Sequence, residues 1–60
     1  MVGAGKLFLT QMIRHHRGAI SMAQKEIKSG QYPAATAIAR SLITSQQQEI
    51  NTMESILASL

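Results

Sequence analysis

The sequence contains no cysteine and no tryptophan among its 60 residues. Without cysteine, the chain has no disulfides, no thiolate zinc site and no cysteine nucleophile. Only Phe8 and Tyr32 are aromatic, so few side chains are available to stack on nucleobases. No apolar run approaches the ~20 residues that a membrane-spanning helix needs. The chain is therefore expected to bind no nucleic acid and to have no membrane span.

Charged residues are also few, with six Lys and Arg against three Glu and a formal net charge of +3. The basic residues are dispersed, which favours a solvated helix face; a weak basic surface for anionic partners is the alternative. No serine or threonine has the sequence context of an activated nucleophile, and no glycine-rich phosphate loop is present. We therefore expect a protein that is not an enzyme.

Two long helices with one short break account for most of the chain. The first is expected from about Lys6 to Ser29, a turn from 30 to 32, and the second from about Pro33 to Leu60. Gly30 suits the position after a helix end, because glycine takes a positive φ without strain. Proline suits the first turn of the second helix, where no amide hydrogen is needed. Residues 1–5 are expected to form a disordered stub or an expression remnant.

This pattern predicts an all-α fold, an antiparallel two-helix hairpin forming one domain over residues 6–60. At 100° per residue, apolar side chains fill about half the circumference of each helix. A two-helix hairpin covers only part of such faces, so we expect self-association. The simplest form is a homodimer that completes a four-helix bundle, with a higher homo-oligomer also open. Alternatively, the chain is a fragment whose missing helices cover these faces.

Several polar or sulfur-containing side chains fall on the apolar sides of the two predicted helices. They are Met12, His15, His16 and Met22 on the first helix, and Gln46, Glu49 and Met53 on the second. His16 lies near the centre of its apolar arc, whereas His15 lies on the flank beside Met22. With the turn centred near Gln31, His16 is level with Gln46. These side chains should therefore lie within about two helical turns of one another.

Two interpretations of this cluster remain open. In the first, no metal binds, and a hydrogen-bonded pair of His16 with Glu49, completed by Gln46, sets the packing register of the helices. In the second, thioether and imidazole groups bind copper, above all Cu(I), with silver as its mimic. His15, His16 and Glu49 could also hold Cu(II) or zinc. His15 is then the better candidate for a ligand, and His16 for the partner of Glu49.

The residues also resemble a known family. The chain is similar to the domain-of-unknown-function family 305 in two segments. The first is Phe8-x3-Met12-Ile13-x-His15-His16-x2-Ala19-x2-Met22-Ala23, and the second is Gln46-x2-Glu49-Ile50-x2-Met53. That family includes a cyanobacterial copper-resistance protein. The resemblance implies a ferritin-like helical bundle in the periplasm or outside the cell, binding copper or silver through methionine and histidine. It implies Met12, His15, His16, Met22 and Met53 as ligands, with Glu49 and Gln46 orienting the imidazoles or ligating occasionally.

Overall fold

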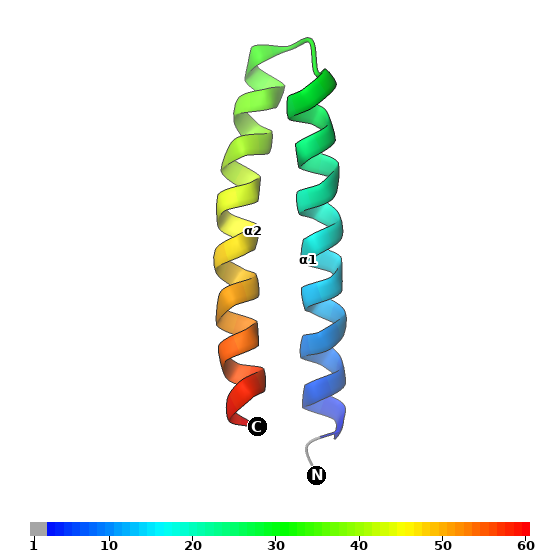
Figure 1. Cartoon of the computed structure of the whole chain (residues 1–60), viewed down its shortest axis with the longest axis vertical. Coiled ribbons are helices and arrows are strands. Elements are labelled where there is room, and N and C mark those ends of the chain that lie inside the picture. Colours follow the sequence, from blue (N-terminus) through cyan, green and yellow to red (C-terminus); the bar gives the residue numbers. More distant parts are fainter. Residues whose placement is uncertain (1–2) are drawn as a thin grey trace.

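The computed structural model describes residues 3–60, which form two α-helices, α1 (Gly3–Ser29) and α2 (Pro33–Ser59). The helices run antiparallel side by side, so the start of α1 and the end of α2 lie at the same end, the open end of the hairpin (Figure 1). The hairpin measures 48 × 14 × 12 Å. No strand occurs within residues 3–60. The predicted all-helical hairpin is confirmed, and the turn falls at residues 30–32 as expected.

The start of α1 differs from the expectation. The helix begins at Gly3 rather than at Lys6, so residues 3–5 are helical and not a disordered stub. Extending an existing helix by a residue adds one hydrogen bond at little cost, which outweighs the weak helix propensity of glycine. The same expectation for residues 1 and 2 lies outside the described part of the chain. At the other end, α2 stops at Ser59, one residue before the predicted end.

Gly30 fits the turn for a different reason from the one predicted. No glycine within residues 3–60 has a positive φ, so that part of the prediction is wrong. Instead, the Gly30 amide donates a hydrogen bond of 2.6 Å to the carbonyl of Glu26. A Cβ atom at Gly30 would collide with that same carbonyl oxygen and with the Glu26 side chain. The close approach of the backbone, rather than a left-handed conformation, is what requires glycine here.

The second helix begins as its proline predicts. Tyr32 has an extended backbone (φ −109°, ψ 116°), as expected for a residue that precedes proline. Pro33 occupies the first turn of α2, where its missing amide hydrogen leaves no helical bond unmade. The Tyr32 carbonyl accepts a hydrogen bond of 3.1 Å from the amide of Thr36. The chain therefore reverses direction within three residues, which holds the two helices as antiparallel neighbours.

The core between the helices is thin. The buried apolar side chains of the described residues are Ile13, Ala23, Ala39 and Ile50, to which His16 adds a buried imidazole. Large apolar side chains remain in contact with solvent, with exposed fractions from 45% for Ile56 to 72% for Met22. The expectation that a hairpin alone leaves much hydrocarbon uncovered is therefore confirmed.

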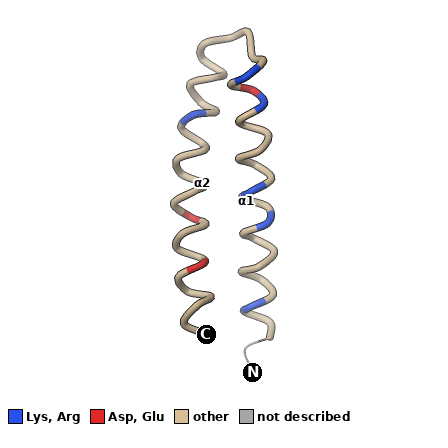
Figure 2. The backbone as a smooth tube through the Cα atoms, in the orientation of Figure 1, with Lys and Arg blue, Asp and Glu red and all other residues tan. Residues whose placement is uncertain are grey.

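Charge is spread along the hairpin and does not gather at one place. Figure 2 shows basic residues distributed along α1 and acidic positions on both helices. The basic residue of α2 is Arg40. The predicted dispersion of charge is thus confirmed for the described residues. Neither α1 nor α2 is long and apolar enough to cross a membrane.

Candidate functional site

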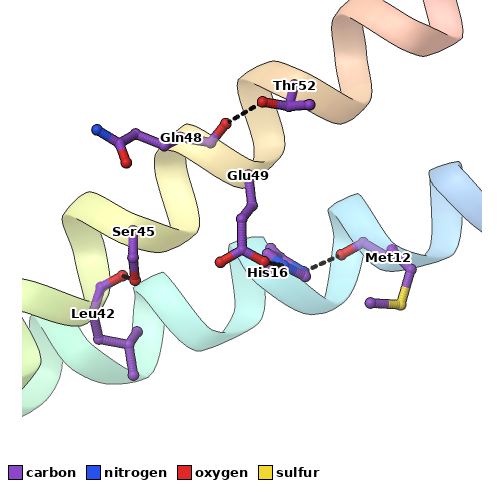
Figure 3. Close-up of polar contacts among 7 residues, drawn as sticks. All are labelled: Met12, His16, Leu42, Ser45, Gln48, Glu49 and Thr52. Carbon is purple, nitrogen blue, oxygen red and sulfur yellow. Dashed lines mark hydrogen bonds and ion pairs between the residues drawn. The ribbon is translucent and has the colours of Figure 1, made fainter.

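A buried histidine joins the two helices at the middle of the hairpin. The Nε2 atom of His16 lies 2.9 Å from Oε1 of Glu49, and the Nδ1 atom lies 2.7 Å from the backbone carbonyl of Met12 (Figure 3). The His16 side chain is only 11% exposed, whereas the Glu49 side chain is 57% exposed. The predicted His16–Glu49 pair is confirmed. The Met12 carbonyl, four residues before His16 on the same helix, completes it.

Both ring nitrogens of His16 face acceptors, and this favours the protonated imidazolium. The Met12 carbonyl can only accept, so Nδ1 carries a hydrogen; the ionised Glu49 carboxylate can only accept, so Nε2 carries one as well. The hydrogen bond to Glu49 is the main cause that raises the pKa of His16 above its ordinary value of 6.5. Burial opposes the rise, while the Met12 carbonyl and the charge of Glu49 add to it.

The direction of the side chains explains why His16 meets Glu49 and not Gln46. Long side chains on a helix lean toward its N-terminus. In this antiparallel pair His16 leans toward the open end and Glu49 toward the turn, so their tips meet although Glu49 lies one turn beyond Gln46. Gln46 is partly buried and takes no part in the hydrogen bonds of His16. The prediction that Gln46 completes the pair is wrong for this reason.

A second ion pair also links the two helices. Arg17 donates a hydrogen bond of 3.0 Å to Oε2 of Glu54, and the two side chains are 64% and 48% exposed. An exposed pair of this kind contributes about 0–1 kcal/mol to stability. The residue pattern does not predict this pair, because both residues lie at solvent-facing positions where the apolar periodicity gives no sign of a partner.

The methionines near His16 line a groove together with it. This groove, called here the Met groove, has a volume of about 400 Å³ and is lined by Phe8, Leu9, Met12, His16, Ser45, Gln48, Glu49, Thr52 and Met53. Ser45 and Thr52 flank Glu49 along α2, and their hydroxyls donate back to the carbonyls of Leu42 and Gln48 (Figure 3). Four predicted site residues thus meet in one place: Met12, His16, Glu49 and Met53.

The other predicted ligands lie elsewhere. His15 and Met22 line a shallow hollow along α1 with Arg14, Gly18, Ala19 and Ser21, and none of these residues lines the Met groove. The predicted position of His15 beside Met22 is confirmed. The predicted gathering of all candidate ligands at one site is not, because His15 and His16 point from neighbouring positions in directions about 100° apart. The set His15, His16 and Glu49 for Cu(II) or zinc is therefore not assembled within this hairpin.

The donor atoms decide which metals suit the Met groove. Nowhere in residues 3–60 do three His, Asp or Glu side chains gather as they would to hold a metal ion. The groove brings together two thioethers, one imidazole and one carboxylate. Thioether and imidazole donors suit soft ions such as Cu(I), whereas zinc and harder ions prefer thiolate, imidazole and oxygen sets. The residues present fit a soft monovalent ion better than they fit zinc.

Sequence reasoning missed the groove walls, Phe8, Leu9, Ser45, Gln48 and Thr52. The spacing of three of them from predicted site residues could have identified them. Phe8 lies four residues before Met12, Ser45 lies four residues before Glu49, and Thr52 lies three residues after Glu49. Residues at these spacings share one side of a helix. The role of the Met12 carbonyl as a hydrogen-bond acceptor was not predicted, because every residue has a backbone carbonyl and the residue types do not show which one accepts.

Comparison with known proteins places the chain among its relatives. The profile of the family described as "Domain of unknown function (DUF305)" matches residues 2–57. The chain belongs to this family. It is 42% identical over 52 residues to "Uncharacterized protein L153" of Acanthamoeba polyphaga mimivirus, a match that covers 87% of this chain and 34% of the relative. The chain thus spans about a third of the length of that relative. No solved structure matches it.

Proposed function

We propose that this DUF305 hairpin binds soft monovalent metal ions, Cu(I) or Ag(I), in the Met groove and so serves in metal binding or copper tolerance. The observation that carries the proposal is the convergence of Met12 and Met53, from different helices, on the groove that also holds His16 and Glu49. Methionine is usually core filler, yet here two thioethers border an open groove beside an imidazole. The ligands proposed are the two thioethers and Nε2 of His16.

The hydrogen bond from Nδ1 of His16 to the Met12 carbonyl supports this role. A metal-binding histidine commonly donates its other ring hydrogen to a carbonyl or a carboxylate, which fixes the orientation of the ring. His16 makes that bond at 2.7 Å with Nδ1, its Nε2 is bonded to Glu49, and both residues line the open groove. For a metal ion to bind, Nε2 would have to give up its proton to solvent, and Glu49, which holds Nε2 in the free protein, would have to release it. In the single hairpin Glu49 is 57% exposed, so it has room to move aside wherever the groove is not covered by another chain.

The alternative is a metal-free helical oligomerisation domain in which the buried His16–Glu49 pair sets the packing register. One observation favours it: both ring nitrogens of His16 already have partners, at 2.7 and 2.9 Å. Under either proposal the protein is not an enzyme. A periplasmic or extracellular location is proposed on the family resemblance alone.

Titration with Ag(I) and Cu(I) tests the first proposal against the second. The variants Met12→Leu and Met53→Leu remove one thioether each and nearly conserve volume, whereas Met22→Leu removes a thioether outside the groove and serves as the control. We expect one ion per chain, bound more tightly than micromolar, with at least tenfold weaker binding in the two groove variants and unchanged binding in Met22→Leu. Zn(II) should bind far more weakly.

Wild-type binding of Ag(I) and Cu(I) weaker than micromolar, or equal loss in all three variants, would contradict the metal proposal. In the first case the metal-free domain is favoured if the melting temperature also stays unchanged when Ag(I) or Cu(I) is added. A ligand that binds the folded state raises the melting temperature by mass action, so thermal melting gives an independent measure of binding.

A further inference from the structure

Most of the exposed large apolar side chains of the two helices lie on one side of the hairpin, and Leu7 is an exception. A second groove, near the turn, is lined by both helices, and Ala19, Met22, Ile38 and Leu42 are among its residues. At 100° per residue, Phe8, Met12, Ala19 and Met22 follow a single strip of α1. The Met groove and the groove near the turn therefore lie on the same side. We call this side the apolar face and define it by Phe8, Met12, Met22, Ile38, Leu42 and Met53.

This face is both apolar and uncovered. Phe8 is 61%, Met22 72% and Ile38 67% exposed. None of the Lys and Arg residues lines either groove, and Glu26 and Glu49 are the carboxylates that do. A covered carboxylate is costly unless it is paired. Glu49, at mid-length, is already paired with His16, so the centre of the face can be covered without leaving that charge alone.

The exposed area of the hairpin is larger than its size requires. Its accessible surface is 4624 Å². A compact folded monomer of the same mass exposes about 3,800 Å². The excess of roughly 800 Å² equals the share that one partner buries in a protein–protein interface of standard size. The hairpin thus carries about as much surplus surface as one stable interface would remove.

We propose that the apolar face is the docking surface for a second copy of this chain, packed face to face about a two-fold axis into four helices. A two-fold interface uses the same surface on both partners, so it needs a self-complementary face. The apolar face meets this need because it runs along both helices and carries no Lys or Arg in its grooves. Packing a pair of helices on a pair of helices is the common way to cover such strips.

The test compares two neighbouring residues that are equally exposed but point to different sides. Phe8 is 61% and Leu7 59% exposed, and Leu7 lies about 100° further round α1, away from the face. Sedimentation equilibrium and light scattering of the wild-type chain should give about twice the chain mass of 6.5 kDa. Phe8→Glu, and Ile38→Glu near the turn, should weaken dimerisation at least tenfold, whereas Leu7→Glu should leave it unchanged.

Thermal melting of the wild-type chain keeps the test decisive if the charged variants fail to fold. The melting temperature of a dimer rises with protein concentration, whereas that of a monomer does not. A wild-type mass of 6.5 kDa at every concentration with a constant melting temperature would overturn the proposal and assign the face to a different partner or to another part of a longer chain. Equal weakening by Leu7→Glu and Phe8→Glu would also overturn it. Both measurements use metal-free protein, so their outcome is separate from that of the metal proposal.

Discussion

His16 and Glu49, which are 33 positions apart in the chain, share a hydrogen bond of 2.9 Å that links the two helices at mid-length. The bond joins a buried imidazole to a carboxylate at the solvent edge. Because the Met12 carbonyl accepts from the other ring nitrogen, the arrangement is complete only when His16 is protonated. The proton on His16 is therefore part of the packing between the helices.

The first prediction concerns the dependence of stability on pH. The pKa of His16 is raised in the folded state above its ordinary value of 6.5, so folding favours the protonated form. The stabilisation from this group is fully present below pH ~6.5 and is lost as pH rises through the folded-state pKa. We expect the free energy of unfolding of metal-free protein, measured with urea at fixed protein concentration, to fall over that range and then level off.

Glu49→Gln should flatten this pH dependence, because the amide removes the charge and the strong acceptor that raise the pKa of His16. Glu54→Gln is the matched control, since Glu54 is also a partly exposed carboxylate on α2 but is bonded to Arg17. It should keep the wild-type slope. If both variants lose the slope, or neither does, the His16–Glu49 bond is not its origin.

The second prediction separates the adjacent histidines. His16→Ala removes a buried ring and both of its hydrogen bonds, so it should lower the free energy of unfolding by about 2 kcal/mol. His15→Ala changes an exposed side chain that makes no such bond and should stay within about 0.5 kcal/mol of wild type. Urea unfolding followed by circular dichroism, without metal, measures both. Similar losses in the two variants would mean that His16 does not anchor the hairpin.

These histidines also show how far the sequence could predict the structure. The apolar periodicity of each helix identified the hairpin, the buried position of His16 and its pairing with Glu49, because those follow from rotation per residue and a short turn. Gln46 was predicted as a partner because it lies level with His16 along the hairpin. That prediction did not allow for the tilt of long side chains toward the N-terminus of their own helix. The separation of His15 from His16 follows from the rotation of about 100° per residue, which the projection of the first helix contains. Which side chains of α2 meet each of them depends on how the two helices pack, which a single-helix projection does not contain.

The third prediction concerns the ion pair of Arg17 with Glu54. Both side chains are largely exposed, at 64% and 48%, so solvent screens their attraction. Arg17→Ala should cost less than about 1 kcal/mol at low ionic strength, and the difference from wild type should shrink in high salt. Glu49→Gln provides the contrast, because its partner His16 is buried and less screened. A cost for Arg17→Ala that grows with salt would point to a packing role of the arginine stem.

The last prediction compares two glycines whose surroundings differ. At Gly30 an added Cβ would collide with the backbone oxygen of Glu26, an atom that cannot move without distorting the end of α1. Gly30→Ala should therefore lower the free energy of unfolding by about 1–2 kcal/mol. At Gly18, inside α1, nothing lies within 4 Å of the added atom and φ is not positive. Gly18→Ala should raise stability by about 0.5–1 kcal/mol, because alanine loses less backbone freedom in a helix. Thermal and urea unfolding at equal protein concentration rank the two variants, and the reverse ranking would mean that the turn adapts to a side chain at Gly30.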